Sequence, residues 1–388
     1  MPTARRIYFD NAATSWPKPE TVYQAVDDYQ RRLGAPAGRS AYRDAAEVEL
    51  AVAAARSAVA RLIGAEEPAR IIFTQNGTQG LNFAIHGLLR PGDHVVTTIA
   101  EHNSVLRPLR DLENDGQISV SRVPVDGAGI VDPDEIRAAL TAATRLIALT
   151  AASNVTGAVQ PIEAVGRLAR EAKVRFLVDA AQAVGHWPLA VKEVHADLVA
   201  APGHKGLLGP LGTGFLYLAP GIEQELRSIQ QGGTGSRSDQ DVQPAEMPDK
   251  YESGNLNVPG LIGLRAGVEY VLERTVEVLR QEEQTLTAEL LAGLHDTAAV
   301  KIYGPTDPAA RVGVVSLTFA DFDPQVLAAL LDSTYQIQTR AGLHCAPLMH
   351  QALGTLAQGG TLRLSLGPFN QIEEVRQFLG ALNELAMS

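Results

Sequence analysis

Residues 174–205, VRFLVDAAQAVGHWPLAVKEVHADLVAAPGHK, contain two short apolar runs, each followed by an ionisable residue at or near its end. The runs at 174–178 and 198–200 consist mainly of apolar and β-branched residues, a pattern that predicts buried β-strands. Asp179 directly follows the first run, and Lys205 follows the second, 26 residues after Asp179. The stretch therefore predicts two strands that lead to a carboxylate and to an amine.

The same pattern continues through the centre of the chain. Apolar runs at 70–74, 94–98 and 145–150 also predict buried strands, and residues 162–172 form an amphipathic helical pattern that starts after Pro161. Alternating strands and helices predict an α/β fold with a mainly parallel sheet covered by helices. Ligands of such sheets bind at the carboxyl ends of the strands, so the functional residues are expected in the loops that follow them.

The pattern changes after about residue 262. Long helices are expected over 264–294 with one or two breaks, followed by a new set of strands and helices. We therefore expect a large domain at 15–262 and a smaller α+β C-terminal domain at 263–388, with segment 1–14 packing nearby. The polar, glycine-rich stretch 231–243 is expected to be a mobile loop.

The composition of the chain argues against some classes of binding partner. The 388 residues have a formal net charge of −11, which opposes binding to nucleic acid or to anionic lipid. No window approaches the roughly 20 apolar residues of a membrane helix, and the first residues do not resemble a signal peptide. One cysteine cannot form an internal disulfide or, alone, a metal site, so we expect no metal and a cytoplasmic chain.

The loop after the 70–74 strand contains Gly77 and Thr78 at a predicted helix start. Free backbone N–H groups at a helix start, together with a hydroxyl group, make a cradle for phosphate. An ordinary strand–helix turn capped by Thr78 explains the same residues. This segment alone leaves both interpretations open.

Asp179 and Lys205 each have a structural and a functional interpretation. A carboxylate at the end of an apolar strand needs a partner, which is either a pyridinium nitrogen or the start of the next helix. Lys205 is enclosed by glycine and proline, which suits a Schiff base because desolvation lowers the pKa of the amine. The alternative is a lysine whose stem lies along the surface.

Two further predicted strands lead to His102 and to Asn154. The imidazole of His102 is suited to stacking on a flat cofactor ring, and Asn154 is suited to a hydrogen bond with a ring substituent. Histidine is also a frequent packed or capping residue, and Asn-x-x-Gly is a frequent turn. The sequence does not decide between these interpretations.

A second cluster, Arg-Ala-Gly-Leu-His-Cys-Ala-Pro at 340–347, contains the only cysteine of the chain, Cys345. Neighbouring positive charge favours a thiolate, so this thiol is a candidate nucleophile, although a free cysteine is otherwise often a small buried apolar residue. Arg363 alternates with leucines along a predicted strand. It suits either a clamp on a substrate carboxylate or a structural salt bridge.

In this order the segments resemble the class V aminotransferase family of fold-type I pyridoxal-phosphate (PLP) enzymes. Within it they are similar to the cysteine desulfurases and selenocysteine lyases of the Suf-type (group II) branch. The most specific motifs are Asp-x-x-Gln at 179–182, Gly-His-Lys at 203–205 and Arg-x-Gly-x-His-Cys-Ala at 340–346. The resemblance covers nearly the whole chain.

The resemblance implies a role for each matching residue. Lys205 would form the Schiff base with PLP, and Cys345 would receive the sulfur. The other implied cofactor contacts are Asp179 at the pyridine nitrogen, Gln182 at the ring hydroxyl, His102 stacked on the ring, Asn154 beside the ring oxygen, and Gly77, Thr78 and His204 at the phosphate.

The substrate contacts are implied in the same way. Arg363 would bind the carboxylate of cysteine, with Asn154 and Arg340 as further substrate contacts. Arg340 and His344 would also support the loop that carries Cys345.

In the family the site lies at a dimer interface. Residues 251–255, Tyr-Glu-Ser-Gly-Asn, resemble the stretch by which the neighbouring subunit reaches the phosphate, so a homodimer with Asn255 in the cofactor site is implied. This chain departs from the family at Asn255, where threonine is common, and in the spacing from Cys345 to Arg363. It also has Pro202 before Gly-His-Lys, which offers phosphate neither a hydroxyl nor an N–H group.

The resulting prediction is a PLP-dependent cysteine desulfurase that acts on L-cysteine, releases L-alanine and holds a persulfide on Cys345. An acceptor protein would take the sulfur, with iron–sulfur cluster assembly as the expected process. The alternatives that keep PLP are selenocysteine lyase, a sulfoxide C–S lyase, and a class V transaminase or epimerase. A third hypothesis is a non-catalytic protein that keeps the fold for ligand sensing.

Overall fold

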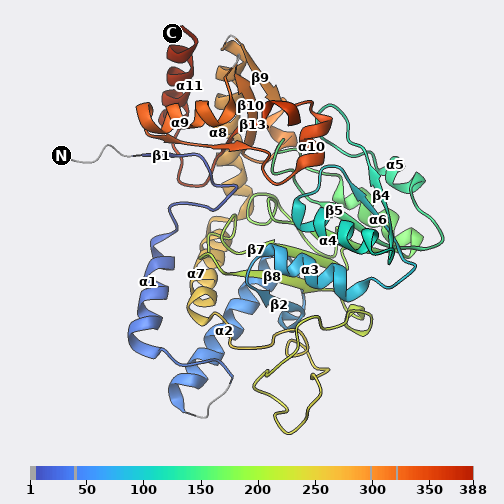
Figure 1. Cartoon of the computed structure of the whole chain (residues 1–388). Helices are drawn as coiled ribbons and strands as arrows, with labels where there is room; N and C mark the ends of the chain where they lie inside the picture. Colours follow the sequence, from blue (N-terminus) through green and yellow to red (C-terminus); the bar gives the residue numbers. More distant parts are fainter. Residues whose placement is uncertain (1–5, 39–41, 298, 320–321, 388) are drawn as a thin grey trace.

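The fold of the described residues is built around a large seven-stranded and a small four-stranded β-sheet, with a two-stranded sheet beside the small one (Figure 1). The computed structural model describes residues 6–38, 42–297, 299–319 and 322–387. The small sheet and its helices lie at the top of Figure 1, and the large sheet lies below them.

The large sheet has seven strands in the order β2-β8-β7-β6-β5-β3-β4. Neighbouring strands from β7 to β4 are parallel, whereas β8 is antiparallel to both of its neighbours. The strands are β2 Ile71–Thr74, β3 His94–Thr98, β4 Ser119–Val123, β5 Thr144–Thr150, β6 Arg175–Asp179, β7 Leu198–Pro202 and β8 Gly214–Leu218. The mainly parallel α/β sheet is confirmed, and the five predicted strands lie within two residues of their predicted bounds.

Helices cover both faces of the large sheet because successive strand residues point to opposite sides. On β6, Phe176 and Val178 pack into the cluster with α2, α6 and α7, whereas Leu177 packs into the cluster with α3 and α4. The helices of this part are α1 Glu20–Asp28, α2 Arg43–Leu62, α3 Gly77–Leu88, α4 Asn103–Asn114, α5 Pro133–Ala138, α6 Ile162–Ala172 and α7 Val258–Arg274. The predicted helix at 162–172 is confirmed.

The small sheet is antiparallel, with the strand order β12-β13-β10-β9. Its elements are α8 Val276–Asp296, β9 Val300–Tyr303, β10 Val314–Phe319, α9 Pro324–Tyr335, β12 Arg340–Gly342, α10 Pro347–Ala352, β13 Thr361–Ser365 and α11 Ile372–Met387. Beside it, β1 Ile7–Tyr8 pairs in parallel with β11 Ile337–Gln338. Phe9 packs into the apolar cluster that the small sheet forms with α8, α9 and α11. The N-terminal segment therefore lies against the C-terminal part of the chain.

Five short helical turns complete the fold of the described residues. They are the π-helical turn η1 Tyr29–Leu33 and the 3-10 turns η2 Pro68–Arg70, η3 Ile222–Gln224, η4 Pro308–Ala310 and η5 Leu356–Gln358. The stretch 231–243 forms neither helix nor strand.

The predicted domain boundary at residue 262 falls inside α7, which packs on α1 and α2 beside the large sheet. The helical chain breaks at Thr275, which has a left-handed φ of 65° and caps α8 with its side chain. We propose that the division between the two domains lies at Thr275.

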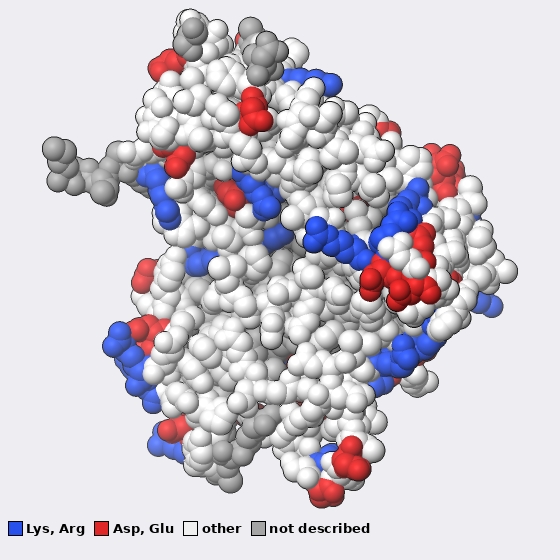
Figure 2. Space-filling model, in the orientation of Figure 1, with Lys and Arg blue, Asp and Glu red and all other residues white. Residues whose placement is uncertain are grey.

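The surface carries charges of both signs. On the face drawn in Figure 2, basic and acidic side chains lie close to one another between wide uncharged areas. The net negative charge is therefore not gathered into one acidic patch on this face. In the part of the chain that the structure describes, no helix is long and apolar enough to cross a membrane.

Candidate active site

A pocket with an empty volume of about 510 Å³ lies at the carboxyl edge of the large sheet, where the loops after its strands meet. Eight of the predicted site residues line it: Gly77, Thr78, His102, Asn154, Asp179, Gln182, His204 and Lys205. Residues from five separate loops thus come together, as the parallel sheet leads one to expect.

Lys205 enters this pocket shortly after β7 and is only partly exposed. Its amine makes no hydrogen bond with the described residues. Burial lowers the pKa of Lys205 to about 8, while the charge of Asp179 raises it and those of Arg363 and Arg340 lower it. A larger share of this amine is therefore unprotonated near neutral pH than in an exposed lysine, which suits a nucleophile or a proton acceptor.

Two residues that the sequence analysis missed anchor the backbone on which Lys205 sits. Ser15 Oγ donates to the carbonyl of Lys205 at 3.0 Å. Lys18 Nζ donates to the carbonyl of His204 at 2.8 Å, and burial lowers the pKa of Lys18 to about 8. The N-terminal segment therefore fixes the backbone of the turn that contains His204 and Lys205.

Asp179 ends β6 and is 4% exposed. Its Oδ1 accepts a hydrogen bond from the N–H of Ala181 at 3.0 Å, and its Oδ2 makes none with the described residues. Burial raises the pKa of Asp179, whereas the Ala181 N–H and the charge of Lys205 lower it. One oxygen therefore closes the turn after β6, and the other is available to a ligand such as a protonated ring nitrogen.

The start of α3 forms an anion cradle beside the pocket. Asn76 caps this helix by accepting from the N–H of Gln79 at 2.9 Å, so the alternative in which Thr78 is the cap is wrong. The N–H groups of Gly77 and Thr78 lie in the first turn and have no helical acceptor. Nδ1 of His204 is buried and has no hydrogen-bond partner among the described residues. These donors fit the phosphate group of PLP.

Gly77 packs directly on Pro202, where a Cβ at position 77 would lie 3.0 Å from Cδ and 3.2 Å from N of the proline. The Gly77→Ala substitution is therefore expected to displace the start of α3 and to weaken PLP binding by roughly tenfold, or about 1.4 kcal/mol. Titration of cofactor-free protein with PLP measures this. The control Gly380→Ala, whose Cβ would meet nothing within 4 Å, should bind normally. Equal affinities of the two variants would argue against the cradle.

Gln182 lines the pocket, and the nitrogen of its side-chain amide already makes a hydrogen bond. Its Nε2 donates to the carbonyl of Ala12 at 3.1 Å. The N-terminal segment thus packs on the predicted cofactor pocket, and the amide oxygen of Gln182 makes no hydrogen bond with the described residues.

His102 and Asn154 line the pocket, and each also has a structural role. His102 caps α4 by accepting from the N–H of Ser104 at 3.0 Å, and burial followed by the charge of Lys205 lowers its pKa to about 4. The ring is therefore neutral at physiological pH, which suits stacking. Asn154 Nδ2 donates to the carbonyl of His344, so it connects the pocket to the cysteine loop.

Glu101, to which the sequence analysis gave no role, is fully buried beside the pocket. Its Oε1 accepts from Thr98 Oγ1 at 2.7 Å and from the N–H of Thr150 at 3.1 Å, while Oε2 has no hydrogen-bond partner in the described part of the chain. Burial raises the pKa of Glu101 to about 8, the two hydrogen bonds lower it, and the charge of Asp179 raises it. Glu101 is therefore mainly protonated at neutral pH.

This shift predicts a pH dependence of stability. The folded protein holds the Glu101 proton more tightly than the unfolded chain, so stability falls as the pH rises from 4.5 to about 8. Glu101→Gln, which stays neutral, should gain about 1.4 kcal/mol per pH unit relative to the wild type in this window. Urea unfolding from pH 5 to 8 measures the gain. Glu49 is exposed, so the free energy of unfolding of the control Glu49→Gln should vary with pH as that of the wild type does. The prediction would be refuted if the free energy of unfolding of Glu101→Gln also varied with pH as that of the wild type does.

Arg363 lies on β13 and is 1% exposed. Its Nη2 pairs with Asp10 Oδ1 at 2.8 Å, and its Nη1 donates to the carbonyl of Asn154 at 3.1 Å. Arg340 lies directly opposite on β12 and has no ion pair with the described residues. The structural salt bridge is thus present. The guanidinium of Arg340, whose charge lowers the pKa of Arg363, has no carboxylate partner among the described residues and leaves positive charge for a substrate carboxylate. Asp10 was missed from sequence.

Cys345 is exposed, in the turn between β12 and α10. His344 and Cys345 both have left-handed φ angles, 47° and 59°, which are unusual for residues other than glycine. The turn is held by the N–H of Asn103, which donates to the Cys345 carbonyl at 2.8 Å. The ring of His344 contacts Thr361 Oγ1 at 3.1 Å in the small sheet, and burial lowers its pKa to about 2. His344 therefore supports the loop as a neutral ring.

Asn255 does not join the pocket within its own chain. It lines a separate pocket together with Glu252 and Ser253. Arg56 anchors this segment through two contacts with the Glu252 carboxylate, at 2.7 and 2.8 Å. Its predicted cofactor contact is therefore not made in this arrangement of one chain, and a contact from a second subunit stays a prediction.

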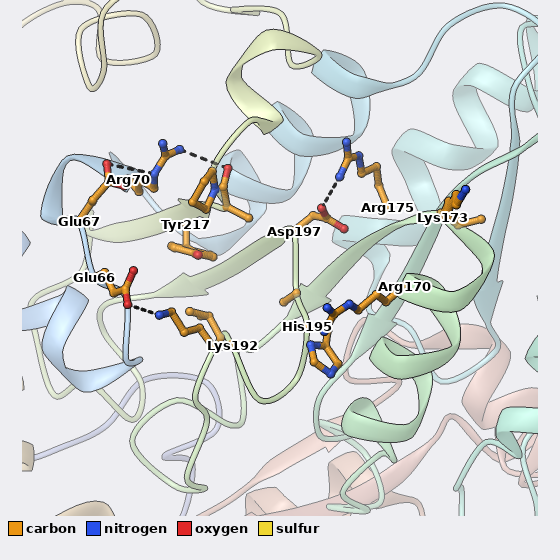
Figure 3. Close-up of a pocket in the computed structure, with 15 residues that line it drawn as sticks. Glu66, Glu67, Arg70, Arg170, Lys173, Arg175, Lys192, His195, Asp197 and Tyr217 are labelled. Atoms are coloured by element: carbon orange, nitrogen blue, oxygen red, sulfur yellow. Dashed lines mark hydrogen bonds and ion pairs between the residues drawn. The ribbon is translucent and has the colours of Figure 1, made fainter.

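A larger pocket, with an empty volume of about 1320 Å³, lies at the opposite edge of the large sheet (Figure 3). Several of its basic side chains are already paired with carboxylates of the chain: Arg175 with Asp197 at 2.7 Å, and Lys192 with Glu66. It contains none of the predicted site residues. The chemistry therefore points to the smaller pocket at the carboxyl edge.

The sequence profile of the family described as aminotransferase class-V matches residues 7–378. The chain belongs to this family. Among curated relatives, a protein named probable cysteine desulfurase from Methanothermobacter thermautotrophicus is 36% identical, with 98% of this chain and 94% of the relative covered. A cysteine desulfurase from Serratia proteamaculans is 31% identical, with 97% and 93% covered.

Solved structures agree with this assignment. A cysteine desulfurase from Thermococcus onnurineus NA1 aligns with a TM-score of 0.92 at 33% identity, covering 98% of this chain and 95% of the other. A cysteine desulfurase from Escherichia coli aligns with a TM-score of 0.87 at 27% identity, covering 98% and 94%. The predicted family and fold are confirmed, whereas the Suf-type branch stays a prediction.

Proposed function

We propose that the chain is a PLP-dependent cysteine desulfurase that converts L-cysteine to L-alanine and carries the sulfur as a persulfide on Cys345. The observation that carries the proposal is the link between the two predicted centres. The Asn154 side chain binds the carbonyl of His344, and the Asn154 carbonyl binds Arg363. The pocket of Lys205 and the loop of Cys345 thus share one residue, and the curated relatives named cysteine desulfurase support the same activity.

The residues of the pocket fit PLP. Gly77, Thr78 and His204 would hold its phosphate, Asp179 its ring nitrogen, and Lys205 its aldehyde carbon. His102 would stack on the ring, with Gln182 and Asn154 at the ring oxygen. When bound, PLP supplies an electron sink for negative charge on the substrate carbon next to the amino group.

The chain's own groups supply the other parts of the reaction. Arg363 binds the carboxylate of cysteine, with Arg340 adding positive charge, and the Lys205 amine takes a proton from the substrate. The Cys345 thiolate attacks the substrate sulfur. A sulfur–sulfur bond forms, the carbon–sulfur bond breaks, and its electron pair stays with carbon, which takes up a proton on the way to alanine.

Selenocysteine lyase is the second candidate, because selenocysteine offers the same carboxylate and amine to these residues, with selenium in the place of sulfur. A transaminase or epimerase is disfavoured, since neither reaction needs the exposed thiol of Cys345. Comparing rates with cysteine, cysteine sulfinate and selenocysteine decides among these substrates.

The proposal extends to partners. A homodimer would bring Asn255 of a second subunit to the phosphate, and the separate pocket in which Asn255 lies in its own chain is consistent with this arrangement. An acceptor protein would take the sulfur from Cys345, with cytoplasmic iron–sulfur cluster assembly of the Suf type as the proposed setting.

One experiment tests the function directly. The purified protein is incubated with L-cysteine, the peptide containing Cys345 is examined by mass spectrometry, and alanine is measured in parallel. We expect one added sulfur atom on Cys345 and one alanine for each sulfur removed. Alanine without sulfur on Cys345 would point to a different lyase.

A further inference from the structure

Two contacts join the cofactor side of the fold to α8, beyond the residues assigned to the site. His186 and Trp187 lie in the turn that follows Gln182. Nδ1 of His186 lies 2.7 Å from Oε2 of Glu283 on α8. One turn earlier on α8, the guanidinium carbon of Arg280 lies 3.5 Å from the ring centroid of Trp187. We call these four residues the α8 seam.

On one side, the seam rests on the residue that follows Lys205. A Cβ on Gly206 would lie 2.7 Å from Cδ2 and 2.9 Å from Nε2 of His186, so the imidazole packs directly on the backbone of Gly206. A Cβ on Gly185 would lie 2.1 Å from the carbonyl oxygen of Gly206. Any shift of His186 is therefore transmitted to the turn that carries Lys205.

On the other side, the seam reaches the strand of Arg363. Glu283 Oε1 accepts from the N–H of Gly313 at 2.7 Å. The carbonyl of Gly313 accepts from the N–H of Leu366 at 2.8 Å, immediately after β13. A Cβ on Gly313 would lie 2.6 Å from Cγ of Glu283, so the carboxylate can approach only because this residue is glycine. Glu283 thus binds the small sheet and the His186 turn at once.

We propose that His186 and Glu283 are positioning residues, which set the small sheet with Arg363 and Cys345 at the correct distance from Lys205. The inference rests on the proposed function, which needs the Cys345 thiol to reach the sulfur of a substrate held near Lys205. A misplacement of about 1 Å between reacting groups is enough to lower a rate on the order of a hundredfold.

The charge of His186 is part of the contact. Burial lowers the pKa of His186, but the attraction and hydrogen bond of Glu283 outweigh burial, so the pKa is raised. The charge of Lys205 lowers this pKa, and Glu283 also interacts with the charge of Arg280 on the same helix. The ionic part of the contact is therefore present at low pH and is lost as the pH rises through the raised pKa of His186.

The test compares PLP-loaded His186→Gln and Glu283→Gln with a matched control, Glu289→Gln. Glu289 also lies on α8, where it pairs with Arg376 at 2.8 Å, away from the seam. For the seam variants we expect kcat/KM for cysteine to fall by about tenfold to a hundredfold, with PLP affinity unchanged. The ratio of wild-type to His186→Gln kcat/KM should be largest at low pH and should shrink at high pH.

A second readout does not depend on activity. Cys345 is the only cysteine and takes a fluorescent label, and Trp187 is the only tryptophan left in a Trp16→Phe background. Energy transfer from Trp187 to the label should change in the His186→Gln and Glu283→Gln variants and not in Glu289→Gln.

Three outcomes decide the inference. Unchanged kcat/KM and energy transfer in the seam variants would overturn it. A fall in kcat/KM matched by an equal loss of PLP affinity would also overturn it, because His186 would then serve cofactor binding. If the wild type forms no persulfide from cysteine, the proposed function fails, and a change in energy transfer alone still supports the positioning role.

Discussion

Replacing Lys205 with alanine is expected to remove the visible absorption band of lysine-bound PLP and to lower cysteine turnover by at least about a thousandfold. The physical reason is that Lys205 is the amine whose pKa is lowered by burial in the predicted cofactor pocket. Without it, neither the covalent attachment nor the proton transfer has a matching group. Absorption spectra of protein mixed with PLP and alanine assays measure both effects.

The control for a lost positive charge is Lys192→Ala, because Lys192 is exposed and lies at the opposite edge of the sheet. Its spectrum and turnover should equal those of the wild type. A visible band that persists in Lys205→Ala would show that another amine holds the cofactor, and Lys18, with its lowered pKa, would be examined next.

The five predicted strands were correct because buried parallel strands form nearly continuous apolar runs. Strands β4 and β8 were not predicted. β4 is an edge strand whose first residue is exposed and whose next three are partly exposed, so it lacks such a run. β8 lies in a glycine-rich stretch and returns antiparallel to β7, which the strand–helix alternation does not indicate.

The pocket residues could be predicted from sequence because each follows a strand and the parallel sheet places all of these loops at one edge. The ion pairs could not be predicted. Asp10 and Arg363 are 353 positions apart, and Glu283 lies 97 positions from His186. The first pair depends on how the N-terminal segment packs on the small sheet, and the second on how α8 packs beside the large sheet, which local patterns do not specify. The stretch Tyr-Phe-Asp-Asn-Ala-Ala-Thr at 8–14, where the resemblance to the family begins, was the one signal that could have indicated the role of Asp10.

Sequence reasoning also treated as alternatives some roles that the structure combines. Asp179 closes a turn with one oxygen and leaves the other for a ligand, and His102 caps a helix while its ring lines the pocket. The reason is that a residue at the end of a strand lies next to the loop that lines the pocket, so it can stabilise the backbone of that loop and also point into the pocket. A capping role therefore does not argue against a catalytic one at this edge.

The Cys345→Ala variant is expected to keep the absorption band of bound PLP but to form no persulfide and no alanine from cysteine. The backbone of the loop should stay in place, because the Asn103 N–H binds the Cys345 carbonyl and Asn154 binds the His344 carbonyl, and neither bond involves the thiol. Only the nucleophile is lost, so the fall in turnover should reach the detection limit while PLP affinity is unchanged. Mass spectrometry, alanine assays and PLP titration measure these quantities, and Cys345→Ser tests whether a polar group alone suffices. Wild-type turnover in either variant would mean that Cys345 does not receive the sulfur, and the exposed thiol would then need another explanation.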